Sequence, residues 1–156
     1  MMNPFDNTTP EPTKFINLIH ISDYEECNFY FQNTMNLLNI KEYKSAIEIA
    51  NDGLFIDPDN ISLLILKAKI LTYSNHNLPA KIIEINLNEA LRIFNLVEVV
   101  FKRKYTKLLK VKDIRLISKD DLFNWLNDKI KLNGLKEILK LYFKHFEMEI
   151  IFQQDC

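Results

Sequence analysis

Glycine is almost absent from this chain of 156 residues, which contains only Gly53 and Gly134. Average usage of about 7% would give roughly eleven glycines in a chain of this length. Glycine supplies the positive backbone φ that tight turns and two-residue hairpins need, so the chain can form few of either. Apolar residues make up 47% of the sequence and charged residues 26%, as in ordinary globular proteins. The sequence therefore predicts a folded, all-α protein.

Charge is distributed unevenly, although the net charge is only -1. Residues 1–60 carry ten acids and three bases, a net of -7, whereas residues 101–146 carry thirteen bases and five acids, a net of +8. Such asymmetry either steers an encounter with a charged partner or attracts one end of the molecule to the other. Cys27 and Cys156 match neither a disulfide framework nor a zinc motif. Since no signal peptide and no long apolar run is recognisable either, we expect a cytoplasmic protein.

Apolar spacing and capping residues predict a series of helices. A flexible arm over residues 1–12 and a short helix within residues 13–21 come first. The capping signals for longer helices are Ser22 or Asp23, Asn60, Asn77 with Pro79 in the first turn, and Ser118. The expected helix ends are near Asn39, before Asp57, near Ser74, and at Asn133 and Gly134.

The last two helices raise separate questions. A helix from Pro79 toward Lys112 would be unusually long for a small domain, so we expect a break near Asn86 or Lys104. A final helix from about Leu135 carries a stripe of large apolar side chains: Leu135, Ile138, Leu139, Tyr142, Phe143, Phe146 and Ile150. Left in water, this stripe would expose more apolar surface than monomers usually tolerate. We therefore predict that it docks within the chain, against a second copy or against another protein.

Residues 41–60, KEYKSAIEIANDGLFIDPDN, place a Tyr, an Ala, a Gly and a late Pro at fixed offsets. This segment resembles the second half of a tetratricopeptide repeat, a unit of two helices with a small residue at each crossing. In this register the unit starts at Cys27, and Ala46 and Gly53 lie where two helices cross closely. A second, degenerate unit would start at Ile61 and lacks the late proline.

The resemblance implies antiparallel helical hairpins of a short array over residues 13–112 and a C-terminal helical cap over residues 113–156. In the family, the first helices of stacked units line a groove that binds peptides or other extended partners. By register, the groove residues here would be Asn28, Phe31, Met35, Leu38, Asn39, Ser62, Ile65, Lys69, Thr72 and Tyr73. Only Lys69 is basic, so a clamp for a C-terminal carboxylate is not expected. The same residues could instead pack internally, with a capping helix filling the groove.

No motif for catalysis, metal binding or a cofactor is recognisable. His20, His76 and His145 are isolated, and no paired Cys/His spacing of a metal site exists. Two distant glycines cannot build a phosphate-binding loop. Cys27 lies in an amphipathic helical pattern without a motif-level histidine partner, which favours a buried thiol over a nucleophile. We therefore expect no metal, no cofactor and no enzymatic activity.

The strongest rival to protein binding is a basic segment over residues 102–112. Its bases are Lys102, Arg103, Lys104, Lys107, Lys110 and Lys112. On a continuous helix Arg103, Lys107 and Lys110 would share one face, which could bind nucleic acid or anionic lipid or pair within the molecule. The sequence predicts an adaptor or chaperone-like scaffold that binds another protein or peptide through a helical-repeat groove. The alternatives are anion binding through residues 102–112, an obligate structural subunit, or a homo-oligomer formed through the C-terminal helix.

Overall fold

The computed structural model describes residues 27–152, which are mostly helical and contain no strand. Residues 27–39 form the first described helical segment. It is followed by α2 (Tyr43–Ile56), α3 (Ile61–Tyr73), α4 (Ala80–Lys104), α5 (Thr106–Leu109), the 3-10 helix η1 (Ile114–Leu116) and α6 (Lys119–His145). The all-α class that the scarcity of glycine predicts is confirmed. Outside the described residues lie the arm over 1–12, the short helix within 13–21, His20, the cap at Ser22 or Asp23, and Cys156.

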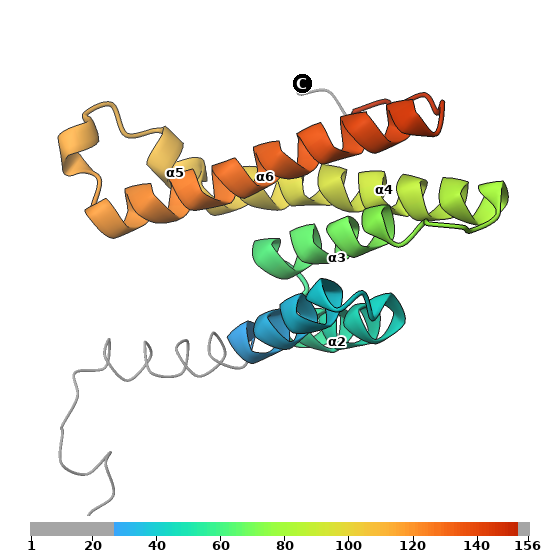
Figure 1. Ribbon diagram of the computed structural model, residues 1–156. Helices are drawn as coiled ribbons and strands as arrows, with labels where there is room; N and C mark the ends of the chain where they lie inside the picture. Colours follow the sequence, from blue (N-terminus) through green and yellow to red (C-terminus); the bar gives the residue numbers. More distant parts are fainter. Residues whose placement is uncertain (1–26, 153–156) are drawn as a thin grey trace, which may run out of the picture.

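The helices are stacked around α3, which has neighbours on two sides (Figure 1). The helical segment 27–39 and α2 lie on one side of α3, whereas α4 and α6 lie on the other. α4 runs back along α3, and α6 runs back along α4 (Figure 1). α5 and η1 stand at the far end of α4, away from α3. This arrangement lets α6 contact both α3 and α4.

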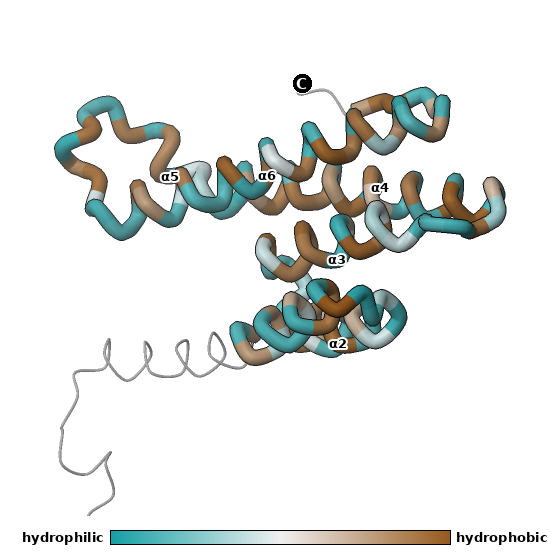
Figure 2. Tube along the Cα trace, in the orientation of Figure 1, coloured by the Kyte–Doolittle hydropathy of each residue, from teal (hydrophilic) through white to brown (hydrophobic). Residues whose placement is uncertain are grey.

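The main hydrophobic core lies between α3, α4 and α6. Its fully buried members include Leu87 and Phe94 of α4 and Leu135, Leu139 and Phe143 of α6. Figure 2 shows hydrophobic residues recurring along these helices and also through the segment with α5 and η1. The predicted docking of the C-terminal stripe is confirmed, and its cover is α3 and α4 of the same chain. Burial of such side chains contributes about 1.5 to 3 kcal/mol each.

Gly53 lies at a close helix crossing, as the sequence predicts. A Cβ atom built there would lie 2.7 Å from Cδ1 of Leu63 and 2.8 Å from Cβ of Tyr30. Because both distances are shorter than real Cβ contacts, any side chain at this position would push α2 away from its two neighbours. Ala46 and Ala50 are fully buried on the same helix. Small residues therefore allow α2 to pack closely.

Local capping explains where several helices begin and end. The Oδ1 atom of Asn60 accepts a hydrogen bond from the Leu63 amide at 3.0 Å, and Oγ of Ser118 accepts one from the Asp121 amide at 3.1 Å. Both predicted N-caps are confirmed, and each satisfies a backbone donor that the first helical turn leaves unpaired. The first helical segment ends at Asn39 as expected, and Lys41 has a left-handed φ of 63°.

The start and course of α4 differ from the prediction. Asn77 has a φ of 62°, which is left-handed, and Pro79 rather than Asn77 occupies the N-cap position. The helix also continues through Asn86 without a break. The Asn86 side-chain amide donates a hydrogen bond to Oδ1 of Asn75 at 2.9 Å, so it ties α4 to the preceding turn. The alternative break, near Lys104, is where α4 does end.

The predicted helix end at Asn133 and Gly134 is wrong, because α6 runs without interruption from Lys119 to His145. A Cβ atom at Gly134 would meet nothing within 4 Å, so this glycine lies on an open face. Leu132 and Leu135 on either side of it are 4% and 0% exposed. Their burial outweighs the penalty of about 1 kcal/mol for glycine inside a helix.

Candidate functional site

The chain's own α6 covers the α3 half of the groove expected from the sequence. Ile65 and Thr72 are 2% and 0% exposed, so they belong to the interior rather than to an open surface. The Tyr73 ring contacts the Tyr142 ring of α6, with centroids 5.7 Å apart, and burial, followed by the Tyr142 charge, raises the pKa of Tyr73. Burial, followed by the positive charge of Lys131, lowers the pKa of Lys69. The internal packing alternative therefore describes this half of the groove.

The half of the expected groove that lies on the first helical segment is more open. Asn28 and Asn39 are exposed, whereas Phe31, Met35 and Leu38 are half-buried against the small core cluster that joins α2 to α3. Asn28 and Phe31 line a small cavity of about 120 Å³. The other lining residues of this cavity are Cys27, Asn60, Ser62 and Lys131. The structure thus brings three expected groove residues, Asn28, Phe31 and Ser62, next to Asn60 of the α2–α3 turn and Lys131 of α6.

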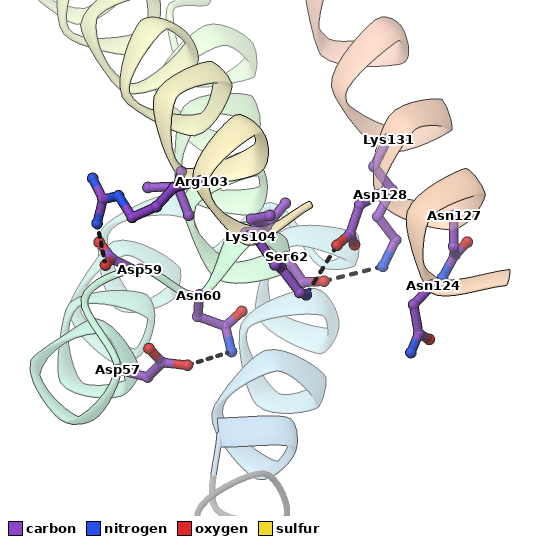
Figure 3. A pocket seen from close by; sticks show the side chains of 12 residues that line it. Asp57, Asp59, Asn60, Ser62, Arg103, Lys104, Asn124, Asn127, Asp128 and Lys131 are labelled. Carbon is purple, nitrogen blue, oxygen red and sulfur yellow. Dashed lines mark hydrogen bonds and ion pairs between the residues drawn. The ribbon is translucent and has the colours of Figure 1, made fainter. Parts of the chain in front are cut away.

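Beside this cavity lies a larger polar cleft of about 730 Å³ (Figure 3). Three parts of the chain form it: the turn between α2 and α3, the end of α4 and the first half of α6. Its polar lining residues are Asp57, Asp59, Asn60, Ser62, Arg103, Lys104, Asn124, Asn127, Asp128 and Lys131. Three acids and three bases line the cleft, so its formal charge is balanced.

Hydrogen bonds hold most of these side chains in place. Arg103 reaches across to Asp59 with Nη1 3.3 Å from Oδ2, and Nζ of Lys131 donates to Oγ of Ser62 at 3.0 Å (Figure 3). The first contact joins α4 to the α2–α3 turn, and the second joins α6 to α3. Asn124 and Asn127, in contrast, make no side-chain hydrogen bond to any described residue. Their amide groups remain available to a ligand.

Asp128 lines the cleft and also links α6 to the end of α4. This aspartate is 8% exposed, and its Oδ2 accepts hydrogen bonds from Tyr105 Oη at 2.5 Å and from Lys104 Nζ at 3.1 Å. Burial raises the pKa of Tyr105 well above its usual range, and the hydrogen bond and negative charge of Asp128 add to this effect. Since a buried carboxylate needs partners, the two contacts are what allow Asp128 to stay inside the protein.

The six bases of residues 102–112 are all exposed, but they do not form one continuous helical face. α4 ends at Lys104, and Tyr105 separates it from α5. Arg103 and Lys104 are drawn into the ion pairs with Asp59 and Asp128, so these two contacts match the alternative of pairing within the molecule. Lys107, Lys110 and Lys112 lie beyond the break and form no ion pair within residues 27–152.

The described part of the chain offers little metal-binding chemistry. Residues 27–152 contain no group of three or more His, Cys, Asp or Glu side chains that could hold a metal ion. His76 and His145 are exposed. Over the same range, none of the helices combines the length and the apolar character needed to cross a lipid bilayer.

The fold and the cleft define an all-α protein with a polar, charge-balanced cleft where three parts of the chain meet. No protein-family model matches the chain, and neither curated proteins nor solved structures give a significant match. The fold class is therefore known from this chain's own structure, and its function must be inferred from its own side chains.

Sequence reasoning missed the α6 side of the cleft. Asn124, Asn127, Asp128 and Lys131 recur at the spacing of one helical face, so a polar stripe was visible in the sequence. The sequence alone does not show that this stripe belongs to a cleft, because Ser62 and Lys104 line the same cleft only in the folded chain. The signal that could have found it is one helical face that is rich in amides and charges over residues 124–131 and apolar over residues 132–143.

Proposed function

We propose that this chain is a protein-interaction module that holds an extended segment of another protein, and that the polar cleft is its binding site. The observation that carries the proposal is the cleft of about 730 Å³ with two asparagines, Asn124 and Asn127, whose amides have no partner in the described chain. The tetratricopeptide-like repeat, the cytoplasmic location and the lack of enzymatic activity remain part of this proposal as predictions from the sequence.

The chemistry of the cleft suits a peptide backbone. An asparagine side chain offers two N–H donors and one carbonyl acceptor, which match the C=O and N–H groups of an extended chain. A volume of about 730 Å³ lies within the range of sites that enclose a small ligand or a short stretch of peptide. Because the three acids and three bases balance, we expect a ligand of mixed polarity rather than a highly charged one.

The adjoining cavity offers a second contact, which would fix how the bound segment lies in the cleft. It shares Asn60, Ser62 and Lys131 with the cleft, and it adds the half-buried ring of Phe31. An apolar side chain of the partner could rest on this ring while its backbone lies along Asn124 and Asn127. The groove surface predicted from the sequence would then contribute through Asn28, Phe31 and Ser62, the three groove residues that line this cavity.

The test is selection from a displayed library of random peptides, with the full-length protein as bait. The affinity of a selected peptide is then measured against the double variant Asn124→Ala, Asn127→Ala. Loss of two hydrogen bonds should weaken binding by about tenfold. Asn133→Ala is the matched control, since Asn133 is an exposed asparagine of the same helix that does not line the cleft. Equal affinity for the double variant and the native protein would show that the cleft is not the site.

A further inference from the structure

The segment over residues 106–118, here called the tip, combines exposed apolar and basic side chains. It contains α5 and η1 and connects α4 to α6 (Figure 1). Leu109, Ile114 and Leu116 are 56%, 64% and 79% exposed, which is unusual for three large apolar residues in so short a segment. Scattered single apolar residues on a surface need no explanation, but a group at a projecting end does.

The tip is not packed down onto the helix behind it. A cavity of about 360 Å³ lies between the tip, the end of α4 and the start of α6. Its lining residues are Lys104, Tyr105, Lys107, Leu108, Val111, Leu116, Ile117, Asp121 and Asn124. Leu116 therefore borders a cavity, and Leu109, Ile114 and Leu116 are all largely exposed to solvent. Burial against an external apolar phase would remove this surface from water.

The charge of the tip indicates what kind of partner would cover its apolar side chains. Its four bases are Lys107, Lys110, Lys112 and Arg115, and its single acid is Asp113. Asp113 is paired with Arg115 at 2.9 Å, which leaves the three lysines without an ion pair in the described chain. Leu109 lies between Lys107 and Lys110, and Ile114 and Leu116 follow Lys112 on either side of Arg115. Apolar side chains flanked by lysines suit the boundary between anionic lipid headgroups and acyl chains.

We propose that the tip docks peripherally on an anionic membrane surface. Leu109, Ile114 and Leu116 enter the boundary between headgroups and acyl chains, while the three lysines lie among the headgroups. The residues proposed to contact the membrane do not line the cleft, although Asn124 lines both the cleft and the cavity beneath the tip. The proposal uses no membrane-spanning segment, and it assigns a purpose to the part of the basic segment that no internal ion pair accounts for.

Co-sedimentation of the full-length protein with two kinds of vesicle tests the proposal. Vesicles of phosphatidylcholine mixed with phosphatidylserine should bind the protein, and vesicles of phosphatidylcholine alone should not. Binding should weaken as salt is raised, since exposed charges are screened. Absence of binding to the anionic vesicles at low salt would overturn the proposal. So would retention on duplex nucleic acid without any binding to vesicles.

Two variants separate the electrostatic part from the apolar part. The triple variant Lys107→Gln, Lys110→Gln, Lys112→Gln should bind about a hundredfold more weakly, at roughly fivefold per lysine. The double variant Ile114→Ser, Leu116→Ser should lose most of the remaining affinity that resists high salt. If either variant binds the anionic vesicles as well as the native protein does, the corresponding half of the proposal is wrong.

Matched controls lie elsewhere on the molecule. Lys44→Gln, Lys81→Gln, Lys144→Gln removes the same charge at three exposed lysines outside the tip. Ile82→Ser, Ile85→Ser changes two exposed isoleucines of α4, which are 42% and 54% exposed. Both controls should bind anionic vesicles nearly as the native protein does. Equal losses in the controls and in the tip variants would mean that vesicle binding follows overall charge and surface hydrophobicity rather than the tip.

Discussion

The inward-facing side chains of α6 differ between its first and second halves: they are mostly polar in the first and apolar in the second. In the second half, Leu135, Leu139 and Phe143 are fully buried in the main core, whereas Leu141 on the outer face is 67% exposed. In the first half, Phe123 and Ile130 are 66% and 60% exposed. The buried residue of that half is Asp128, which is held by Tyr105 and Lys104.

The reason for the difference is the course of the chain opposite α6. α3 and α4 both face the second half of α6, so apolar side chains there find cover. At the first half, α4 ends at Lys104 and the chain turns away through α5. There a charged hydrogen-bonded link accompanies Trp125, which packs against the main core and has its indole Nε1 buried without a hydrogen-bond partner in the described chain. The second half thus contributes most of the buried apolar side chains of α6, whereas the first half lines the polar cleft.

The largest effect should follow from Phe143→Ala. Phe143 is 0% exposed in the main core, so its truncation leaves a cavity and should lower the free energy of unfolding by about 3 to 5 kcal/mol. Chemical denaturation followed by circular dichroism measures this change.

Phe123→Ala is the matched control in the first half of the same helix. Because Phe123 is 66% exposed, the same truncation there should change the stability by no more than about 0.5 kcal/mol. Comparable losses in the two variants would remove the distinction between the halves.

A smaller effect is expected from Asp128→Ala. This substitution deprives the Tyr105 hydroxyl and the Lys104 ammonium of their shared acceptor. A hydrogen bond to a charged group contributes about 1.5 to 3 kcal/mol, so the loss of stability should lie near that range.

Tyr105→Phe tests the same link from the other side. Since it leaves the buried carboxylate paired with Lys104 alone, it should also destabilise, and the double variant should lose less than the sum of the two single losses. Strictly additive losses would indicate that the link between the two helices is not an energetic unit.

The smallest effect, with the opposite sign, belongs to Gly134→Ala. Gly134 lies between the two halves, and an added methyl group would meet no atom within 4 Å, so alanine should stabilise α6 by about 0.5 to 1 kcal/mol. A rise in the midpoint of thermal unfolding measures it.

Gly53→Ala provides the contrast, because a Cβ atom there would lie 2.7 Å from Leu63 and 2.8 Å from Tyr30. That variant should be destabilised by about 1 to 3 kcal/mol. If both alanine substitutions changed the stability in the same direction, the two glycines would not occupy the different environments described above.

What the sequence predicts well is local. The caps at Asn60 and Ser118 depend on residues three positions apart, and both form. The predicted end at Gly134 is wrong because glycine propensity is a weak preference that the burial of Leu132 and Leu135 overrides. Periodicity alone identifies a docking stripe on the last helix but cannot tell which helices cover it.

The candidate site is harder to predict because its residues come from distant parts of the chain. Ser62 and Lys131 are in contact although they lie far apart in the sequence, and neither belongs to a motif. Lys69 and Tyr73 match the groove register, yet α6 covers them, since the register describes a repeat without saying what packs on it. A polar stripe on α6 is readable in the sequence, whereas the cleft that it lines requires the fold.

The central claim is that the first half of α6 recognises a peptide while the second half only holds the fold together. Nuclear magnetic resonance of the 15N-labelled protein tests it most directly, through the side-chain amide signals of its asparagines during titration with a peptide selected from the displayed library. The signals of Asn124 and Asn127 should shift, and that of Asn133 should stay in place. Shifts confined to residues 132–145, with Asn124 and Asn127 unmoved, would contradict the claim.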